Sequence, residues 1–178
     1  MKIPTDEIIT TKRCRLRYPT RADFPHIWSA SRVPGFNDGM MWDPPSTREE
    51  LEVPLKNSQE SWEKGTAFSW TAETKGKGEF IGRIAIRTTD HPQEWSLGYW
   101  THPTLQKRGY ATELAAAVLD FGFTRLCATR IIAEHATWND ASGKVLRRVG
   151  MTTTGVNPKG FKKKGSWVEE YMYEILPP

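Results

Sequence analysis

One pattern limits the fold of this chain more than any other: two short apolar segments separated by an amphipathic helix. Residues 95–100 are apolar on both faces, as is typical of a strand that is covered on both sides. Residues 130–135 form a second short strand. Between them, apolar residues recur at helical spacing from Leu114 to Gly122. A helical crossover makes two strands of one sheet parallel neighbours with a right-handed connection, so the pattern predicts a β-α-β unit.

Further strands and helices flank this unit. Period-two alternation and turn residues predict the other strands at residues 13–18, 68–72, 80–86, 151–156 and 167–176. Capping residues and helical spacing predict the other helices from Thr20 or Asp23 through Trp28, from Ser46 or Thr47 to about Lys64 with a kink near Pro54, and from Asn139 or Asp140 to Val149.

The predicted order is therefore β-α-α-β-β-β-α-β-α-β-β. The sheet is expected to be mixed, because the first four strands favour hairpins while the crossover pair is parallel. No repeat or linker divides the chain, so residues 1–178 are expected to form one α+β domain around a mixed sheet.

Composition excludes several classes of protein. The chain has a net charge of +4 and a pI of about 9.1, which fits an anionic ligand but does not indicate nucleic acid. Its two cysteines, Cys14 and Cys127, lie far apart, so neither a disulfide framework nor a zinc site is expected, and the four histidines show no metal spacing. We expect no metal. The absence of an apolar leader and of an eighteen-residue apolar window indicates a cytoplasmic protein without a membrane partner.

The strongest functional signal is the stretch LQKRGYATEL, residues 105–114, between the strand and the helix of the β-α-β unit. A helix N-terminus leaves backbone N–H groups unpaired and carries partial positive charge, so a strand–loop–helix turn of this kind is an anion site. It is neither a Walker loop nor a dinucleotide fingerprint. The residues that would cradle the anion are Gln106, Lys107, Arg108, Gly109, Tyr110, Ala111 and Thr112.

This stretch matches the pattern Q/R-x-x-G-x-G/A and resembles the pyrophosphate motif of the GNAT superfamily of N-acetyltransferases. The context LGYWTHPTLQKRGYATE, followed about thirty residues later by WNDASGKVLRRVGM, is similar to the RimJ/RimL branch, the ribosomal-protein-alanine acetyltransferase type. The resemblance implies the GNAT fold, in which the central parallel strands splay apart, and acetyl-CoA as co-substrate.

The resemblance also assigns roles to single residues. Trp100 and Thr101 would offer backbone groups to the pantetheine arm, and residues 106–112 would hold the pyrophosphate. Asn139 would contact the cofactor arm, and Ser142 would lie near the thioester sulfur. From the residues alone, Asn139 is a helix cap and Ser142 is a hydroxyl in the first turn of that helix.

The reaction needs a proton donor for the leaving thiolate and a base for the amine. Ser142 is the candidate acid. Family members often carry Glu where this chain has Ser96, and a serine cannot act as the base at neutral pH. Glu94 lies two residues back on the same strand face and is the substitute that we predict. Glu134 and unaided solvent are the alternatives.

The acceptor is predicted to be a primary amine, above all the N-terminal α-amine of a protein or peptide such as a ribosomal protein. A small-molecule amine (an antibiotic or a polyamine) and a CoA-binding role without chemistry are the alternatives. The loop at residues 33–45 either lines the acceptor pocket or is fixed to the core by its own apolar residues. The basic segment from Lys159 to Lys164 is either a solvated hairpin tip or a contact for an acidic substrate or ribosomal RNA. Monomer and homodimer both remain open.

Overall fold

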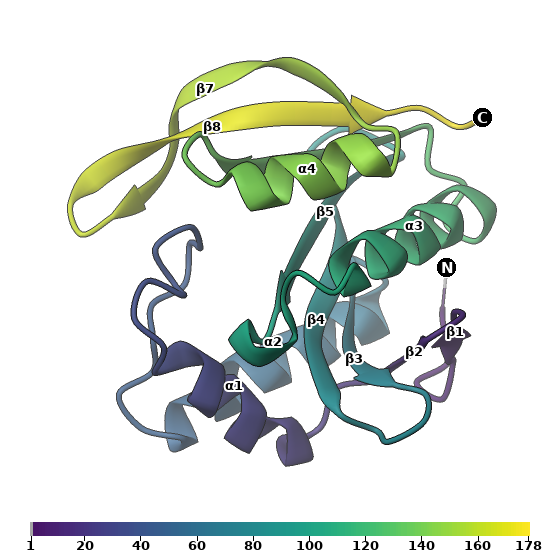
Figure 1. Ribbon diagram of the computed structural model, residues 1–178. Helices are drawn as coiled ribbons and strands as arrows, with labels where there is room; N and C mark the ends of the chain where they lie inside the picture. Colours follow the sequence, from purple (N-terminus) through teal and green to yellow (C-terminus); the bar gives the residue numbers. More distant parts are fainter. Residues whose placement is uncertain (1) are drawn as a thin grey trace.

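The computed structural model describes residues 2–178 as a mixed sheet with helices packed against it (Figure 1). The sheet has the strand order β1-β2-β3-β4-β5-β6-β8-β7. Its strands are β1 (Ile9–Thr10), β2 (Cys14–Arg17), β3 (Ala67–Thr74), β4 (Phe80–Thr88), β5 (Glu94–Thr101), β6 (Arg130–Ala136), β7 (Thr152–Lys163) and β8 (Ser166–Ile175). The helices are α1 (Phe24–Ser31), α2 (Glu52–Lys64), α3 (Tyr110–Thr124) and α4 (Asp140–Arg148), with 3₁₀ turns η1 (Arg21–Asp23), η2 (Glu49–Leu51) and η3 (Pro103–Leu105).

The predicted β-α-β unit is confirmed. Strands β5 and β6 are parallel neighbours joined by α3, and the other pairings between described strands are antiparallel. The predicted order of elements is also confirmed, with β1 added at the edge. Sequence periodicity missed β1 because two residues are too few to show alternation.

Strands β5 and β6 separate soon after they meet. They pair only from Glu94 to Ser96 against Arg130 to Ile132. Beyond that point, residues 97–101 of β5 stay paired with β4, and residues 133–136 of β6 stay paired with β8. The facing edges of the two strands therefore have no strand partner, and their backbone N–H and C=O groups remain for another molecule.

The core lies between the sheet and the helices α2 and α3. Trp62 of α2 packs edge-to-face on Phe68 and Trp70 of β3, with ring centroids 5.1 and 5.2 Å apart. Phe121 of α3 packs on Trp70 at 5.1 Å. Helix α3 approaches the sheet closely at Gly122, where a Cβ would lie 2.7 Å from Cδ1 of Ile131. A side chain at this position would have to displace the ends of the Ile131 and Ile86 side chains.

Two segments differ from the sequence prediction. Helix α2 begins at Glu52, so Pro54 lies in its first turn, where a missing N–H costs nothing, and no kink is needed. Strand β7 also extends further than predicted. Residues 157–163 continue β7, and the chain reverses only at Lys164 and Gly165, which both have positive φ.

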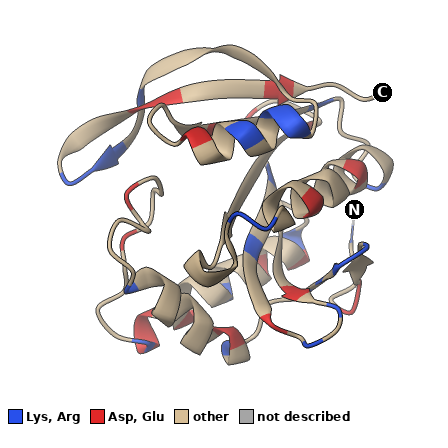
Figure 2. Ribbon diagram, viewed as in Figure 1, with Lys and Arg blue, Asp and Glu red and all other residues tan. Residues whose placement is uncertain are grey.

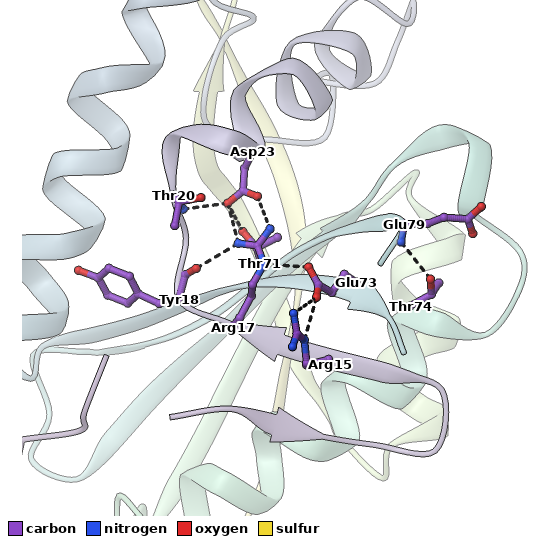
Figure 3. Close-up of polar contacts among 9 residues, drawn as sticks. All are labelled: Arg15, Arg17, Tyr18, Thr20, Asp23, Thr71, Glu73, Thr74 and Glu79. Carbon is purple, nitrogen blue, oxygen red and sulfur yellow. Dashed lines mark hydrogen bonds and ion pairs between the residues drawn. The ribbon is translucent and has the colours of Figure 1, made fainter. Parts of the chain in front are cut away.

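A buried ion network fixes the start of α1 (Figure 3). The carboxylate of Asp23 accepts hydrogen bonds from Arg17 at 2.7 Å, the Thr20 amide at 2.9 Å and the Thr71 hydroxyl at 2.7 Å. Burial alone would raise the pKa of Asp23, but these donors hold it below its ordinary value. Glu73 in turn accepts from Arg15 and Arg17, both at 2.8 Å. The predicted helix start at Thr20 and Asp23 is thus a capping box tied to β2 and β3.

Candidate active site

A cavity of about 1670 Å³ opens where β5 and β6 separate. The free halves of β5 and β6 line it, together with the first turns of α3 and α4, part of α2 and the loop at residues 33–45. Helices α3 and α4 lie side by side on one side of the sheet, so their N-termini reach the same opening (Figure 1). The cavity therefore joins the predicted anion loop to Ser142, the predicted acid.

The anion loop is shaped by left-handed backbone, by a contact with the end of β5 and by a contact from Arg13, which directly precedes β2. Lys107 has φ of +61° and Gly109 has φ of +79°, and α3 begins directly afterwards. The Gln106 side chain donates to the Thr101 carbonyl at 3.2 Å. Arg13 donates to the Arg108 carbonyl at 3.0 Å. These contacts hold the turn at the end of β5.

The charge balance of this loop favours an anion. Glu113, in the first turn of α3, would repel one, but Thr11 and Arg13 each donate to it at 2.6 Å. Burial alone would raise the pKa of Glu113, and these hydrogen bonds hold it below its ordinary value. Lys107 and Arg108 are exposed and form no ion pair with any residue from 2 to 178. The residues of the predicted cradle line the cavity, apart from Arg108.

At the start of α4 the structure adds a partner that sequence reasoning missed. Asn139 is the N-cap, and its side chain accepts from the Ser142 amide at 3.3 Å. The Ser142 hydroxyl lies 3.0 Å from the hydroxyl of Tyr99 on β5. Burial raises the pKa of Tyr99 to about 12, so this phenol stays protonated at neutral pH. Strand alternation, which puts Tyr99 and Trp100 on opposite faces, was the signal that could have revealed it.

Glu94 does not reach the cleft, so its predicted role as the base is wrong. It lies at the closed end of the sheet, where β5 still pairs with β6, and its side chain does not line the cavity. Its carboxylate accepts from the Thr89 hydroxyl at 2.8 Å and pairs with Arg130 at 2.9 Å. Ser96 shares the strand face of Glu94 and does line the cavity. Glu94 lies about 6.6 Å further back along the strand, and that spacing places it outside the cavity.

Two other carboxylates line the cavity, Glu134 of β6 and Glu170 of β8. The register pairs Ala136 with Glu170 and Glu134 with Met172, which puts both acids on one face of the sheet. Glu170 is 8% exposed, and burial together with Glu134 raises its pKa to about 7. Its side chain lies over Gly160 of β7, where any Cβ would overlap the carboxylate. Glu170 could not be found from the sequence, because its place in the cavity depends on the β6–β8 register.

The loop at residues 33–45 both lines the cavity and is held in place. Trp100 packs against Phe36 and Trp42 of this loop, with centroids 5.3 and 6.2 Å apart. Lys163, at the tip of the β7–β8 hairpin, donates to the Trp42 carbonyl at 2.9 Å and pairs with Asp43 at 2.7 Å.

The basic hairpin tip faces the acidic loop in Figures 1 and 2. The Lys163 side chain is only 9% exposed. The prediction of a solvated tip is therefore wrong at Lys163, which holds the hairpin tip against the loop at residues 33–45.

Within residues 2–178, no cluster of three or more His, Cys, Asp or Glu side chains could hold a metal ion. In the same range, no helix has the length and apolar character needed to cross a membrane. Cys14 is buried, Cys127 is exposed, and both are free thiols.

Comparison with known proteins agrees with this geometry. The model of the acetyltransferase (GNAT) domain family matches residues 13–152. The uncharacterized N-acetyltransferase YnaD of Bacillus subtilis is 34% identical over 96 residues, which cover 54% of this chain and 56% of that protein.

Two solved structures share the fold. RimL, a ribosomal L7/L12 alpha-N-protein acetyltransferase in complex with coenzyme A, superimposes with a TM-score of 0.85 at 19% identity, covering 96% of this chain and 98% of that one. RimJ of Mycobacterium smegmatis, bound to CoA-disulfide, gives 0.78 at 23% identity, with 92% and 81% covered. With a family match over most of its length and the splayed strands of its sheet, the chain belongs to the GNAT family of acetyltransferases.

Proposed function

We propose that this protein transfers the acetyl group of acetyl-CoA to a primary amine, and that the amine is the N-terminal α-amine of a protein or peptide. The observation that carries the proposal is that one cavity contains all the parts that the reaction needs. It joins the N-terminus of α3 to the two unpaired strand edges, to the hydroxyl groups of Tyr99 and Ser142, and to Glu170, a carboxylate with a pKa of about 7. The ribosomal substrate in the name of RimL favours a protein N-terminus.

The chain offers a place for each part of acetyl-CoA. The N-terminus of α3 suits the pyrophosphate, because its unpaired N–H groups favour an anion. Lys107 adds positive charge, and Gly109 lets the phosphates approach the backbone. The free edges of β5 and β6 suit the amide groups of the pantetheine arm, which can pair with them as a strand would. The bound co-substrate supplies an activated acetyl thioester, and the residues around it orient it and exclude water.

Two steps of proton transfer then fall to residues of the cleft. Glu170 accepts the proton that the amine loses as its nitrogen bonds to the acetyl carbon. The carbon–sulfur bond breaks, and the leaving thiolate takes a proton from Ser142, which Tyr99 can replenish across 3.0 Å. An α-amine has a pKa of about 8 and a lysine about 10.4, so a base with a pKa of about 7 is better matched to an α-amine.

Replacing Ser142 by Ala is expected to lower kcat about tenfold, the loss of one hydrogen bond to a charged group that forms only in the transition state. The dissociation constant of acetyl-CoA should change by less than about twofold, since the bond matters only as the thiolate develops. Tyr99→Phe is the matched variant, because it removes the second hydroxyl and keeps the ring. Stopped-flow turnover and calorimetric binding of CoA measure the two quantities, and an unchanged kcat in both variants would return Ser142 to a purely structural role.

Thiol release from acetyl-CoA over a panel of acceptors tests the function itself. Peptides with a free N-terminus should release thiol, and the same peptides with a blocked N-terminus should not, even when they contain lysine. Polyamines and aminoglycosides form the second arm of the panel. Turnover with these small amines alone would move the acceptor to that class, and CoA binding without turnover on any amine would leave a binding protein.

A further inference from the structure

Two arginines of β4, Arg83 and Arg87, line the cavity without a carboxylate to pair with. Arg83 and Arg87 alternate along β4 with Ile84 and Ile86, whose side chains are buried in the core on the other face. The register places Arg83 opposite Trp100 and Arg87 opposite Ser96, both on β5. The arginines therefore stand beside the strand edge that the co-substrate would use, on the face of the sheet opposite Tyr99.

The carboxylate whose charge acts on Arg83, that of Asp23, is already engaged. Asp23 is used by Arg17, Thr20 and Thr71 (Figure 3). Glu73 is likewise taken by Arg15 and Arg17. The side-chain hydrogen bond that Arg83 makes is a long one, 3.4 Å to the hydroxyl of Ser58 on α2. Across residues 2–178, neither Arg83 nor Arg87 forms an ion pair.

At Arg83 this arrangement costs stability unless a ligand completes it. Arg83 is partly buried, and burial lowers the pKa of its guanidinium. Arg87 is exposed, and its side chain lies across β5 at Gly98, where a Cβ would sit 3.4 Å from its Nη2 atom. A desolvated charge without a partner is unfavourable, and guanidinium groups match carboxylates and phosphates in a bidentate way. The two arginines thus form a cationic wall in the same cavity that holds the acids Glu134 and Glu170.

We propose that the acceptor carries an anionic group, a carboxylate or a phosphate, in addition to its amine, and that Arg83 and Arg87 bind that group. The inference rests on the proposed acetyl transfer and narrows its substrate class. The amine would lie toward Glu170 and the anion toward β4. A peptide with an acidic residue after its N-terminal residue and a free amino acid with its own carboxylate both have this chemistry, and the test separates them.

The test compares acceptors that differ only in charge. Three pairs are compared: a peptide that begins Ala-Glu with one that begins Ala-Gln, free alanine with alanine amide, and a peptide that begins Ala-phosphoserine with one that begins Ala-Ser. The anionic member should have a kcat/KM at least about tenfold higher in one or more pairs, since a hydrogen bond between charged groups has roughly that effect. The pair with the larger ratio identifies the source of the anion. Equal kcat/KM within every pair would overturn the inference.

Variants of the two arginines locate the effect. Arg83→Gln and Arg87→Gln should each lower kcat/KM about tenfold for the anionic acceptor and less than about twofold for the neutral one. Arg21→Gln is the matched control, because it removes the same charge from an exposed residue that pairs with Glu52 outside the cavity. Arg83→Lys replaces Arg83→Gln if the latter does not fold, and it should keep part of the preference. A preference that survives in both arginine variants would contradict the assignment.

Binding separates this inference from the proposed function. Calorimetric titration of the CoA complex with the acidic and neutral peptides needs no turnover. If the acidic peptide binds to the parent protein and not to Arg83→Gln, the anion site is supported even if no acceptor is acetylated. An absence of turnover with every acceptor would contradict the proposed function alone. Equal binding of both peptides, with turnover on both, would contradict the anion site alone.

Discussion

Gly109→Asp is expected to abolish the stabilisation of this protein by acetyl-CoA. In the parent protein, acetyl-CoA at about 100 times its dissociation constant should stabilise the fold by about 2.7 kcal/mol. For a chain of this size that is a rise of roughly 5–10 °C in Tm. The variant should show none of it, because Gly109 has φ of +79° and the new side chain would put a negative charge where the pyrophosphate binds.

Two further variants separate charge from backbone strain. Gly109→Ala brings the strain without the charge, so it should keep part of the thermal shift. Gly165→Asp places the same side chain at φ of +84° on the hairpin tip, with no atom within 4 Å of its Cβ and no part in the cavity, and should keep the whole shift. If Gly109→Asp folds and shows the same thermal shift as the parent, the assignment of the pyrophosphate site to the N-terminus of α3 is wrong.

The fold could be predicted from the sequence because its decisive signals are local. The stripe from Leu114 to Gly122 and the two short strands around it specify a parallel pair joined by a crossover, and the structure contains that pair. The turn into α3 was equally predictable, since its glycine and the helix start that follows are neighbours in the chain. Boundaries were less accurate where tertiary pairing extends a strand, as in β7 through residues 157–163.

The chemistry of the cleft could not be predicted in the same way, because it depends on register. Glu94 and Ser96 share a strand face, so alternation made Glu94 a credible base, but only the point where β5 leaves β6 decides which of them meets the cavity. Glu170 lies in a strand 36 residues beyond Glu134, and the β6–β8 pairing alone brings the two acids together. Long-range register of this kind has no signature in one sequence.

Glu170→Gln is expected to lower kcat/KM about 10²-fold on the alkaline plateau, the lower range for loss of a general base. In the parent, kcat/KM should rise with pH through about 7 as Glu170 loses its proton, and again near 8 as the free α-amine does. The slope of log kcat/KM against pH below 7 should therefore fall from about two to about one in the variant. A Glu170→Gln enzyme with the parental profile would leave proton removal to Glu134 or to solvent.

Two control variants identify the ionising group. Glu134→Gln removes the negative charge that helps to raise the pKa of Glu170, so the lower limb of the profile should move to lower pH without a large loss on the plateau. Glu94→Gln changes a carboxylate outside the cavity, so both limbs should stay at their parental pH. Movement of the limb in Glu94→Gln and not in Glu134→Gln would reverse this assignment.

The pH dependence of the free energy of unfolding tests the assignment of Glu170 independently of activity. A Glu pKa of about 7 in the folded protein lies above the value of about 4.3 expected for the unfolded chain, so the folded state binds the proton more tightly. This contribution to stability is present below about pH 4.3 and is lost as the pH rises to about 7. Glu170→Gln, which cannot ionise, should therefore lose less stability than the parent between pH 5 and 8 in urea unfolding. If the Glu170→Gln variant is slower but loses less stability with rising pH than the parent, the result fits a base that is kept ionisable for function. If the variant is slower and also less stable at every pH, the substitution has damaged the fold.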